Sequence, residues 1–548
     1  MSLRSKERRV ALMRKHPRSL SRQIASAVPL STALLLVLSG AALEAQYGAV
    51  GLSGVGGRRF AAAQFGNEDE AQFGQVLATG DFNGDGADDL ATGIPEDDRS
   101  GVEDCGAVLL RYGVPGVGFD PNATIGVQIL HQGQAGSPDP LDEADRFGGA
   151  LAACDFNGDG FDDLAVGIPG EAGPGTTGTT GAVEIFFGTG SGIGASLEFL
   201  SPLVPGIPGD DVSGTLFGAA LACGNFDGDA FADLAIGAPT QIVPQPGGTV
   251  AAGAVVVVYG SAGALDPSTA IGLHQNVEGV VGVGAVGDRF GGALAVGDFQ
   301  GDGVEDLAVG VRETGTGAVH LFGGHAGTGI AASEGLYYDE TFFGGNPEPN
   351  DWMGYSLAAG DFDGDEVDEL VIGVPFEDVF AATDGGQLIV VEVSTLGAAF
   401  WTENLIHGDG ATESGDRFGL SLASGDFDGD GFDDLAIGQP GELVVVPEDG
   451  LVTVVMGSPT GITNARRHGL AAGYHGNPGV ADQANRNYGH AVVTGDFDGD
   501  GYADLAIGAP LEDAGGLVDI GAEVVLFGSL FADGFEVGNS GFWSGTVP

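Results

Sequence analysis

The sequence of 548 residues carries 77 acidic side chains against 19 basic ones, which gives a formal net charge of −58. This balance argues against nucleic acid and anionic membrane surfaces as partners, because both are bound through clustered Arg and Lys. Glycine contributes 102 residues, and because the glycines recur at fixed places along the chain they predict turns rather than disorder.

The first 45 residues have the organisation of a secretory signal peptide. A basic stretch precedes an apolar run over 27–38, and small residues lead to an expected cleavage after Ala45. An uncleaved membrane anchor is the alternative, although the apolar run is short for a membrane span. We therefore expect a secreted or cell-surface protein with no membrane span after signal cleavage, in which residues 46–57 form a short linker.

An acidic segment, GDFNGDGADDLATGIP at 80–95, returns six more times along the chain. Its seven copies begin at Asp81, Asp155, Asn225, Asp298, Asp361, Asp426 and Asp496. The spacing of roughly 70 residues is too long for one coil of a solenoid but fits a multi-stranded blade of a propeller. Seven copies predict seven blades.

Short apolar runs surround each acidic segment, such as 164–168 and 182–187, and they are bounded by Gly or Pro. Their length and their Val, Ile and Phe content are typical of β-strands, four to each repeat. The predicted fold class is therefore all-β, a seven-bladed β-propeller of four-stranded blades over 58–528. Because 521–528 is followed by no clear fourth strand, we expect 58–66 to supply it and close the ring. Residues 529–548 form a separate C-terminal tail.

The acidic segments have the spacing of a calcium-binding loop. Side chains at positions 1, 3, 5 and 9 and the carbonyl oxygen of position 7 can surround a hard cation, and Gly at position 4 or 6 allows the tight turn. The candidate ligands, in chain order, are Asp81, Asn83, Asp85, Ala87 and Asp89; Asp155, Asn157, Asp159, Phe161 and Asp163; Asn225, Asp227, Asp229, Phe231 and Asp233; Asp298, Gln300, Asp302, Val304 and Asp306; Asp361, Asp363, Asp365, Val367 and Glu369; Asp426, Asp428, Asp430, Phe432 and Asp434; and Asp496, Asp498, Asp500, Tyr502 and Asp504.

These loops predict up to seven Ca²⁺ sites of unequal strength. Copies one, two, six and seven keep acidic or amide oxygens at positions 1, 3, 5 and 9 and Gly at position 6, so we expect four strong sites. The other three depart from this pattern and should bind more weakly: copy three has Asn225 and Ala230, copy four has Gln300, and copy five has Glu366 and Glu369.

Two further motifs accompany every acidic loop. An aromatic-Gly pair precedes it, as Phe73-Gly74, Phe147-Gly148, Phe217-Gly218, Phe290-Gly291, Phe418-Gly419 and Tyr488-Gly489, with Met353-Gly354 in copy five. A Gly-x-Pro follows it at Gly93, Gly167, Gly237, Gly373, Gly438 and Gly508, whereas copy four has Arg312 in place of Pro. With these motifs the chain resembles FG-GAP repeat proteins, the family of the propeller head of integrin alpha subunits and of many bacterial relatives.

The resemblance implies adhesion or recognition through loops opposite the calcium loops. We accordingly expect a monomer that binds an unknown protein or glycan partner. An extracellular enzyme, such as a polysaccharide lyase or hydrolase, is the alternative, and a purely structural envelope protein is another. No catalytic constellation stands out, since neither GxSxG nor HExxH occurs.

Other reactive residues have simpler interpretations. His131, His274, His407 and His475 recur at the end of the fourth strand on separate blades, which favours packing over metal binding. Arg146, Arg289 and Arg417 each follow an Asp and precede Phe-Gly, so we expect these Asp-Arg pairs to fix a loop. Cys105, Cys154 and Cys223 are too few for a disulfide framework. A bridge between Cys154 and Cys223 is conceivable, but we expect two small buried side chains.

Overall fold

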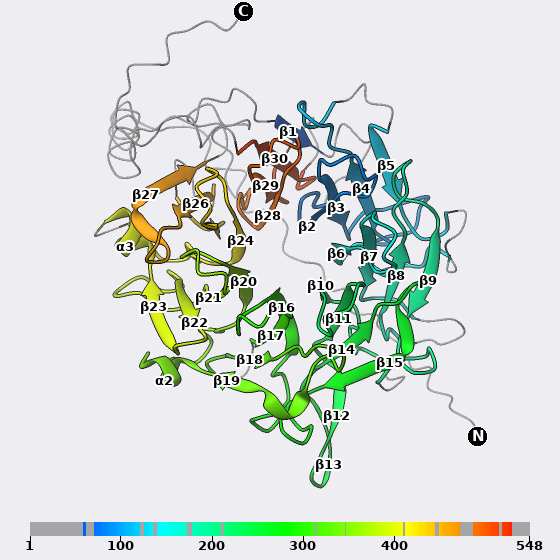
Figure 1. Cartoon of the computed structure of the whole chain (residues 1–548), viewed down its shortest axis with the longest axis horizontal. Coiled ribbons are helices and arrows are strands. Elements are labelled where there is room, and N and C mark those ends of the chain that lie inside the picture. The colour runs from blue at the N-terminus through cyan, green and yellow to red at the C-terminus, as the bar shows by residue number, and fades with distance from the viewer. Residues whose placement is uncertain are drawn as a thin grey trace, which may run out of the picture.

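The computed structural model describes residues 58–61 and 71–528, apart from 121–124, 135–136, 138–139, 173–177, 210–212, 313–314, 346, 409–410, 444–448, 472–485 and 514–517. Seven four-stranded antiparallel sheets stand in a ring around a central axis (Figure 1). The all-β seven-bladed propeller is therefore confirmed. The expected signal peptide (1–45), linker (46–57) and tail (529–548) lie outside the described residues.

Each blade is a meander in which successive strands pair with one another, from the centre of the ring outwards. The blades are β2 (Val76–Gly80), β3 (Asp89–Ile94), β4 (Ala107–Arg111) and β5 (Val127–Leu130); β6 (Ala150–Cys154), β7 (Asp163–Ile168), β8 (Ala182–Phe186) and β9 (Ser196–Leu200); β10 (Ala220–Gly224), β11 (Asp233–Ala238), β14 (Ala254–Tyr259) and β15 (Asp266–Leu273); β16 (Phe290–Gly297), β17 (Asp306–Val311), β18 (Ala318–Phe322) and β19 (Leu336–Tyr338); β20 (Ser356–Gly360), β21 (Glu369–Val374), β22 (Gln387–Glu392) and β23 (Gly397–Trp401); β24 (Ser421–Gly425), β25 (Asp434–Gln439), β26 (Leu451–Met456) and β27 (Thr463–Leu470); and β28 (Ala491–Gly495), β29 (Asp504–Ala509), β30 (Ala522–Leu526) and β1 (Arg58–Ala61).

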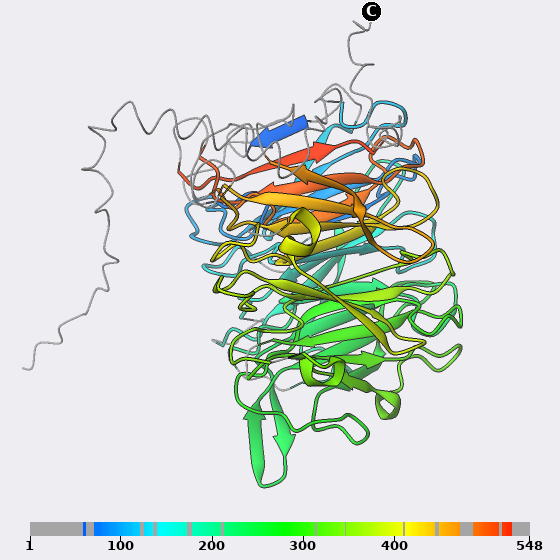
Figure 2. The same cartoon turned by 90° about the vertical axis from the view of Figure 1, so that its left-hand side faces the viewer.

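A few short elements extend this plan. The hairpin of β12 (Ile242–Gln245) and β13 (Gly248–Ala251) projects from the third blade (Figure 2). Three single-turn helices follow or precede outer strands, namely η3 (Ala332–Glu334), α2 (Glu340–Phe343) and α3 (Glu403–His407). Among the described residues, no helix is long and apolar enough to cross a membrane.

The hydrophobic core lies between the blades. The second strand of every blade is buried along its whole length, as in β7, because strands flank it on both sides and a neighbouring blade covers each face. Val108 and Leu110 of the first blade, for example, pack in one cluster with Phe147, Leu164 and Phe186 of the second. Short runs of Val, Ile and Leu therefore form strands here because both of their faces exclude water.

The aromatic-Gly and Gly-x-Pro motifs meet where neighbouring blades touch. A Cβ atom added to Gly93 would lie 2.3 Å from the main-chain oxygen of Gly148, and Gly148 itself has a φ of +87°. Any side chain at Gly93 would push the two blades apart. The same contact joins Gly167 to Gly218, Gly237 to Gly291, Gly310 to Gly354, Gly373 to Gly419, Gly438 to Gly489 and Gly508 to Gly74.

The two ends of the described chain close the ring, as expected. β1 pairs antiparallel with β30, with Arg58 opposite Val525 and Ala61 opposite Ala522. Arg59 Nε donates to Glu512 Oε1 at 2.9 Å, which ties the strand to the loop before β30. Residues 62–66 of the predicted closing segment lie outside the described residues.

Cys154 and Cys223 form a disulfide bond, so the expectation of two unbridged side chains is wrong. The two cysteines lie near the ends of the innermost strands β6 and β10, whose Cα atoms are 6.4 Å apart at this point. Innermost strands converge on the axis, which brings these positions of adjacent blades within disulfide range. Cys105 is buried and free.

Candidate metal centres

All seven acidic loops lie on one face of the ring. Each connects the first strand of a blade to the second, as 81–88 connects β2 to β3. Because the strands alternate in direction, the connections from third to fourth strand share this face. Connections from second to third strand, and from blade to blade, lie on the other face. The predicted ligands of each copy are thus together, while the seven sets are spread around the ring.

The carboxylate at position 1 organises its loop. Asp81 Oδ1 accepts hydrogen bonds from the main-chain N–H groups of Gly84 at 2.8 Å and Asp85 at 3.1 Å, and Oδ2 accepts one from Gly86 at 2.9 Å. Asp85 Oδ1 in turn accepts the N–H of Ala87. These bonds hold the turn that aims the side chains at positions 1, 3 and 5 toward one another.

The carboxylate at position 9 is buried at the base of the loop. Asp89 is fully buried, and its two oxygens accept the N–H groups of Phe82 and Gly113. Burial raises the pKa of Asp89 to about 9. Burial likewise raises the pKa to about 7 for Asp163, Asp233 and Asp306, and to about 8 for Asp434 and Asp504. A bound cation would favour the ionised form of each of these groups.

The residues present fit a hard divalent cation. In copy five, single oxygens of Asp361, Asp363 and Asp365 lie within 4.8 Å of one another, and the same holds for Asp426, Asp428 and Asp434 in copy six. Clusters made only of carboxylate, amide and carbonyl oxygens suit Ca²⁺. When bound, the ion would neutralise these loops, while the protein holds the turn through its main-chain hydrogen bonds.

Copies three to six differ in ways that change their expected strength. In copy three, Asn225 Nδ2 donates to the main-chain oxygen of Asp229, so this amide is already engaged within the loop. In copy four, Gln300 Nε2 donates to Asp306 Oδ1 at 3.2 Å, but in copy one Asn83 Nδ2 donates to Asp89 Oδ1 at 3.3 Å, so this hydrogen bond does not set copy four apart from copy one. An amide nitrogen directed at a carboxylate offers nothing to a cation.

Two residues outside the loops alter copies five and six, and loop spacing alone could not identify either. Glu392, at the end of β22, places a carboxylate oxygen within 4.8 Å of those of Asp363 and Glu369, which adds a candidate ligand to copy five. Arg466, on β27, forms ion pairs with Asp428 and Asp430 of copy six. The guanidinium therefore competes with a cation at a loop that was expected to be strong.

Neighbouring loops are hydrogen-bonded to each other through position 8, which sequence reasoning did not single out. The N–H of Asp81 donates to Asp162 Oδ2 at 2.9 Å, and the N–H of Asp162 donates to the main-chain oxygen of Asp81 at 3.2 Å. The seven candidate centres are therefore mechanically linked around the ring rather than independent.

The structure does not gather the recurring histidines. His131 and His274 directly follow the outer strands β5 and β15, whereas His407 ends helix α3 rather than a fourth strand, contrary to expectation. Buried His407 contacts Thr453 Oγ1 through Nε2 at 3.0 Å. His475 lies outside the described residues. These positions agree with packing roles and form no shared metal site.

The Asp-Arg pairs belong to the turns that enter the blades. Arg146, Arg289 and Arg417 have φ angles of 59°, 53° and 57°. The preceding carboxylates accept main-chain N–H groups: Asp145 from Asp142 at 3.1 Å and Asp288 from Ala285 at 2.7 Å. These carboxylates thus fix the loop through hydrogen bonds from its main chain.

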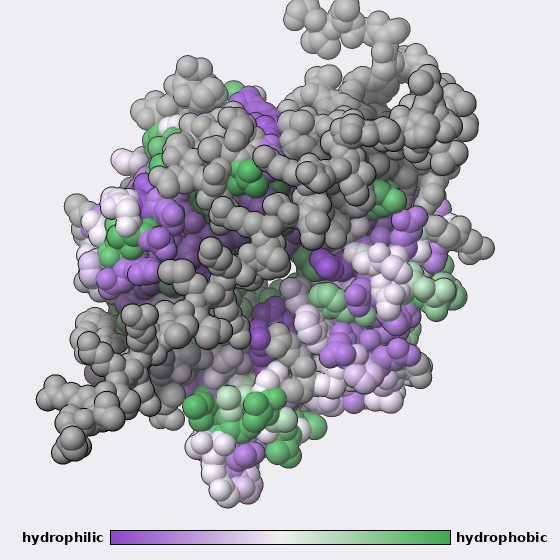
Figure 3. Space-filling model, turned by 180° about the vertical axis from the view of Figure 1, so that it is seen from behind, coloured by the Kyte–Doolittle hydropathy of each residue, from purple (hydrophilic) through white to green (hydrophobic). Residues whose placement is uncertain are grey.

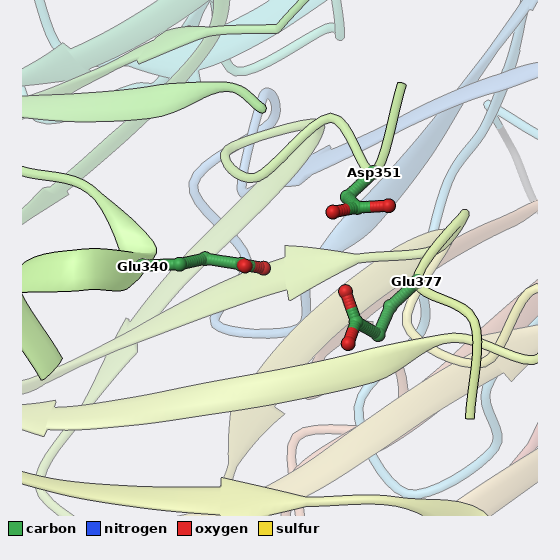
Figure 4. Close-up of side chains that lie close together, drawn as sticks. All are labelled: Glu340, Asp351 and Glu377. Atoms are coloured by element: carbon green, nitrogen blue, oxygen red, sulfur yellow. The ribbon is translucent and has the colours of Figure 1, made fainter. Parts of the chain in front are cut away.

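One acidic cluster lies away from all the loops. Glu340, Asp351 and Glu377 each place one oxygen within 4.8 Å of the others, and Figure 4 shows their carboxyl groups pointing toward one another. They lie after β19, before β20 and after β21, in connections of the face opposite the acidic loops. The equivalent positions of the next repeat hold Glu403, Asp416 and Glu442, which also lie within 4.8 Å of one another, so the signal of this cluster is in the repeat period and not in the loop motifs.

Comparisons with known proteins agree with this architecture. The FG-GAP repeat model matches residues 73–110, 147–185, 217–258, 290–322, 353–391, 418–455 and 488–522, one match to each blade. The chain is 34% identical over 170 residues to integrin alpha-PS2 of Drosophila melanogaster, across 29% of this chain and 11% of that protein. It is 32% identical over 170 residues to phosphatidylinositol-glycan-specific phospholipase D of Bos taurus, across 30% and 19%. The chain thus spans under a fifth of the length of these relatives.

Among solved structures, the rhamnogalacturonan lyase PL11 of Bacillus licheniformis aligns with a TM-score of 0.33 and 13% identity, across 84% of this chain and 75% of that one. The family assignment comes instead from the seven repeat matches, each of which contains an aromatic-Gly or Met-Gly pair and an acidic loop at the observed blade contacts. The chain is a seven-bladed propeller of the FG-GAP repeat family.

Proposed function

We propose that this propeller is a secreted or cell-surface recognition module that binds Ca²⁺ through the loops of one face and a protein or glycan through the loops of the other. The distribution of exposed apolar side chains carries the proposal. Of the twelve large apolar side chains exposed in the described chain, eight lie in connections of the face opposite the acidic loops. They are Val281, Val283, Val286, Phe342, Phe380, Leu405, Leu443 and Val518.

Several of these side chains are so exposed that they contribute little to the packing of their own loops. Phe380 is 90% exposed, and Val283 and Val286 are 72% and 75% exposed. Apolar groups of this size on a soluble protein are typical of binding surfaces when they gather on one face. Figure 3, the view from behind, shows such apolar patches among hydrophilic surface, one of them beside the projecting hairpin.

The same face also carries a concave feature. A pocket of about 320 Å³ lies at the base of the β12–β13 hairpin, lined among others by Phe217, Ile242, Val243 and His274. An apolar pocket with a few polar groups can accept a side chain or a sugar ring. The acidic loops lie on the other face. Their proposed role is to keep the ring rigid, so that the binding loops hold their positions.

The calcium half of the proposal is tested by metal analysis and melting. Ca²⁺ that binds only the folded chain must raise its stability by mass action. We expect elemental analysis to find several calcium ions per chain at millimolar calcium, and chelation to lower the melting temperature. A chain that holds no metal and melts identically in calcium and in chelator would contradict it.

The recognition half is tested by probing glycan and protein arrays with residues 46–548 in calcium. The variant Val283→Asp/Val286→Asp alters the proposed binding face, and Val117→Asp/Leu396→Asp alters two exposed apolar positions of the acidic-loop face. We expect the first variant to lose the captured ligand and the second to retain it. Loss in the second variant alone, or no ligand on either array, would contradict the assignment of the face.

A further inference from the structure

The cluster of Glu340, Asp351 and Glu377 combines burial with three like charges. Glu340 begins α2 after the outer strand of the fourth blade, while Asp351 precedes β20 and Glu377 follows β21 in the fifth blade. Only 1% of Glu340 and 3% of Asp351 is exposed. Figure 4 shows the three carboxyl groups converging on one space from three separate segments.

The protein supplies this cluster with almost no hydrogen-bond donors. Both carboxylate oxygens of Glu340 and Oε2 of Glu377 are buried without a partner. Asp351 accepts the main-chain N–H of Glu348, and its carboxyl group is within hydrogen-bonding reach of that of Glu377, a contact that forms only when one of the two acids holds a proton. Asp339, Glu348 and Asp378, the charged groups that act on the cluster from its surroundings, are acidic as well. Burying ionised carboxylates in this way is costly unless a positive charge joins them.

Equivalent positions in the second blade show how the chain satisfies such a site by itself. There Gln132 stands in the place of Glu340, and its Nε2 donates to Glu171 Oε2 at 2.8 Å, where Glu171 corresponds to Glu377. One amide thus replaces one of the acids, and a hydrogen bond replaces a repulsion.

The seventh blade uses a different solution. Arg486 occupies the position of Asp351, fully buried, with Nη2 2.6 Å from Asp449 Oδ1 and Nη1 4.0 Å from Glu512 Oε2. The guanidinium there brings the positive charge that the site needs. The fifth blade has neither an amide nor an arginine at these positions.

We propose that Glu340, Asp351 and Glu377 bind one Ca²⁺ ion, at a site separate from the seven acidic loops and on the opposite face of the ring. A divalent cation would compensate the three charges and occupy the partnerless oxygens, and an all-carboxylate oxygen set suits a hard ion. The site joins α2 of the fourth blade to the loop that enters the fifth and to the loop after β21. Bound calcium would therefore fasten two blades together on the recognition face.

The sixth blade has three acidic residues at the equivalent positions, but there a neighbouring amide donates a hydrogen bond to one of them. Glu403, Asp416 and Glu442 also lie within 4.8 Å of one another, yet Gln439 Nε2 donates to Glu403 Oε1 at 3.1 Å. The proposal is therefore confined to the fifth blade. This inference goes beyond the proposed recognition of a partner and needs no partner for its test.

The experiment counts calcium. Glu340→Gln/Glu377→Gln introduces the amide found naturally at Gln132, and Glu348→Gln removes a nearby exposed charge as the matched control. Chains are dialysed against buffered calcium and their bound calcium is measured by elemental analysis. We expect the double variant to hold one ion fewer per chain than the parent, and the control to equal the parent.

Thermal melts distinguish calcium binding from protonation, which is the other way in which the three carboxylates could be neutralised. In chelator the double variant should melt at or above the parent, because the repulsion is gone, and calcium should then raise its melting temperature less than that of the parent. Equal calcium content and an equal calcium-induced shift in parent and double variant would overturn the proposal. If the double variant does not fold, Glu377→Gln alone, at a half-buried position, is held to the same two outcomes.

Discussion

The main-chain N–H of Asp496 donates to Asp88 Oδ2 at 2.8 Å, and the N–H of Asp88 donates to the main-chain oxygen of Asp496 at 2.8 Å. This reciprocal pair joins the last acidic loop to the first. Equivalent pairs join Asp81 to Asp162, Asp298 to Asp368 and Asp361 to Asp433. The ring is thus closed twice, by strand pairing at its rim and by loop contacts on its acidic face.

Replacing Asp88 by Ala should destabilise the protein by about 1–2 kcal/mol, because the N–H of Asp496 loses its acceptor in a part-buried place. Asp88→Asn keeps an acceptor oxygen and should stay close to the parent. Denaturant unfolding of the three proteins measures the difference. Equal losses in the Ala and Asn variants would show that charge, rather than the hydrogen bond, matters at this position.

Asp426→Ala should cost more stability than Asn225→Ala. Asp426 accepts three main-chain N–H groups, from Gly429, Asp430 and Gly431, whereas Asn225 accepts one from Asp229. We expect a loss of about 1–3 kcal/mol for Asp426→Ala in calcium. Thermal melts and calcium titration by calorimetry compare the two, and a larger loss for Asn225→Ala would contradict the ranking of the loops.

Arg466→Gln should strengthen cation binding at copy six by about 3- to 10-fold, because the guanidinium pairs with Asp428 and Asp430. Calcium titration by calorimetry compares the parent with Arg466→Gln. Arg467→Gln, one residue away, serves as the control, and equal affinities in parent and Arg466→Gln would contradict the competition.

Buried His320 should make the protein less stable in acid. Its ring nitrogens have no hydrogen-bond partner, and burial lowers its pKa to about 4. In the unfolded chain the histidine has a pKa near 6.5, so between about pH 6.5 and 4 it binds a proton that His320 of the folded protein does not bind. The folded state is therefore at its full stability, as far as His320 is concerned, above about pH 6.5, and it loses stability as the pH falls toward 4.

His320→Leu should therefore remove up to about 3 kcal/mol of the stability lost between pH 7 and pH 4. Urea unfolding at several pH values measures this slope, with the half-buried His325→Gln as the control. A slope identical to that of the parent would show that His320 does not titrate on unfolding.

Deletion of residues 58–66 should produce an aggregation-prone protein, because it exposes the edge of β30 along its pairing with β1. The deletion also removes Phe60, whose ring lies under the Arg111 guanidinium at 4.2 Å. Light scattering and thermal melts test this. A deletion protein that stays monomeric and melts like the parent would mean that another segment closes the ring.

The sequence predicts what is local or repeated in this protein. Blade number, the strands around each loop and the role of β1 follow from a period that is visible without a structure, and the ligands of a loop such as 81–89 lie within nine residues. Contacts between segments far apart in the chain leave no such trace. The contacts of Arg466 and Glu392 each depend on how segments far apart in the chain are brought together, and so does the disulfide between Cys154 and Cys223.

The pairing of Arg58 with Val525 sets the order of events during synthesis. The closing strand β1 is translated before any other strand of the propeller, yet its partner β30 is translated only after six blades and strands β28 and β29. Until then the nascent chain has an open ring, and the long separation of the two strands makes their association a late, slow step. A chain that stops before β30 can form six complete blades, but β1 then has no strand to pair with. The unpaired strand edge of its incomplete last blade should make such a truncated chain prone to aggregation.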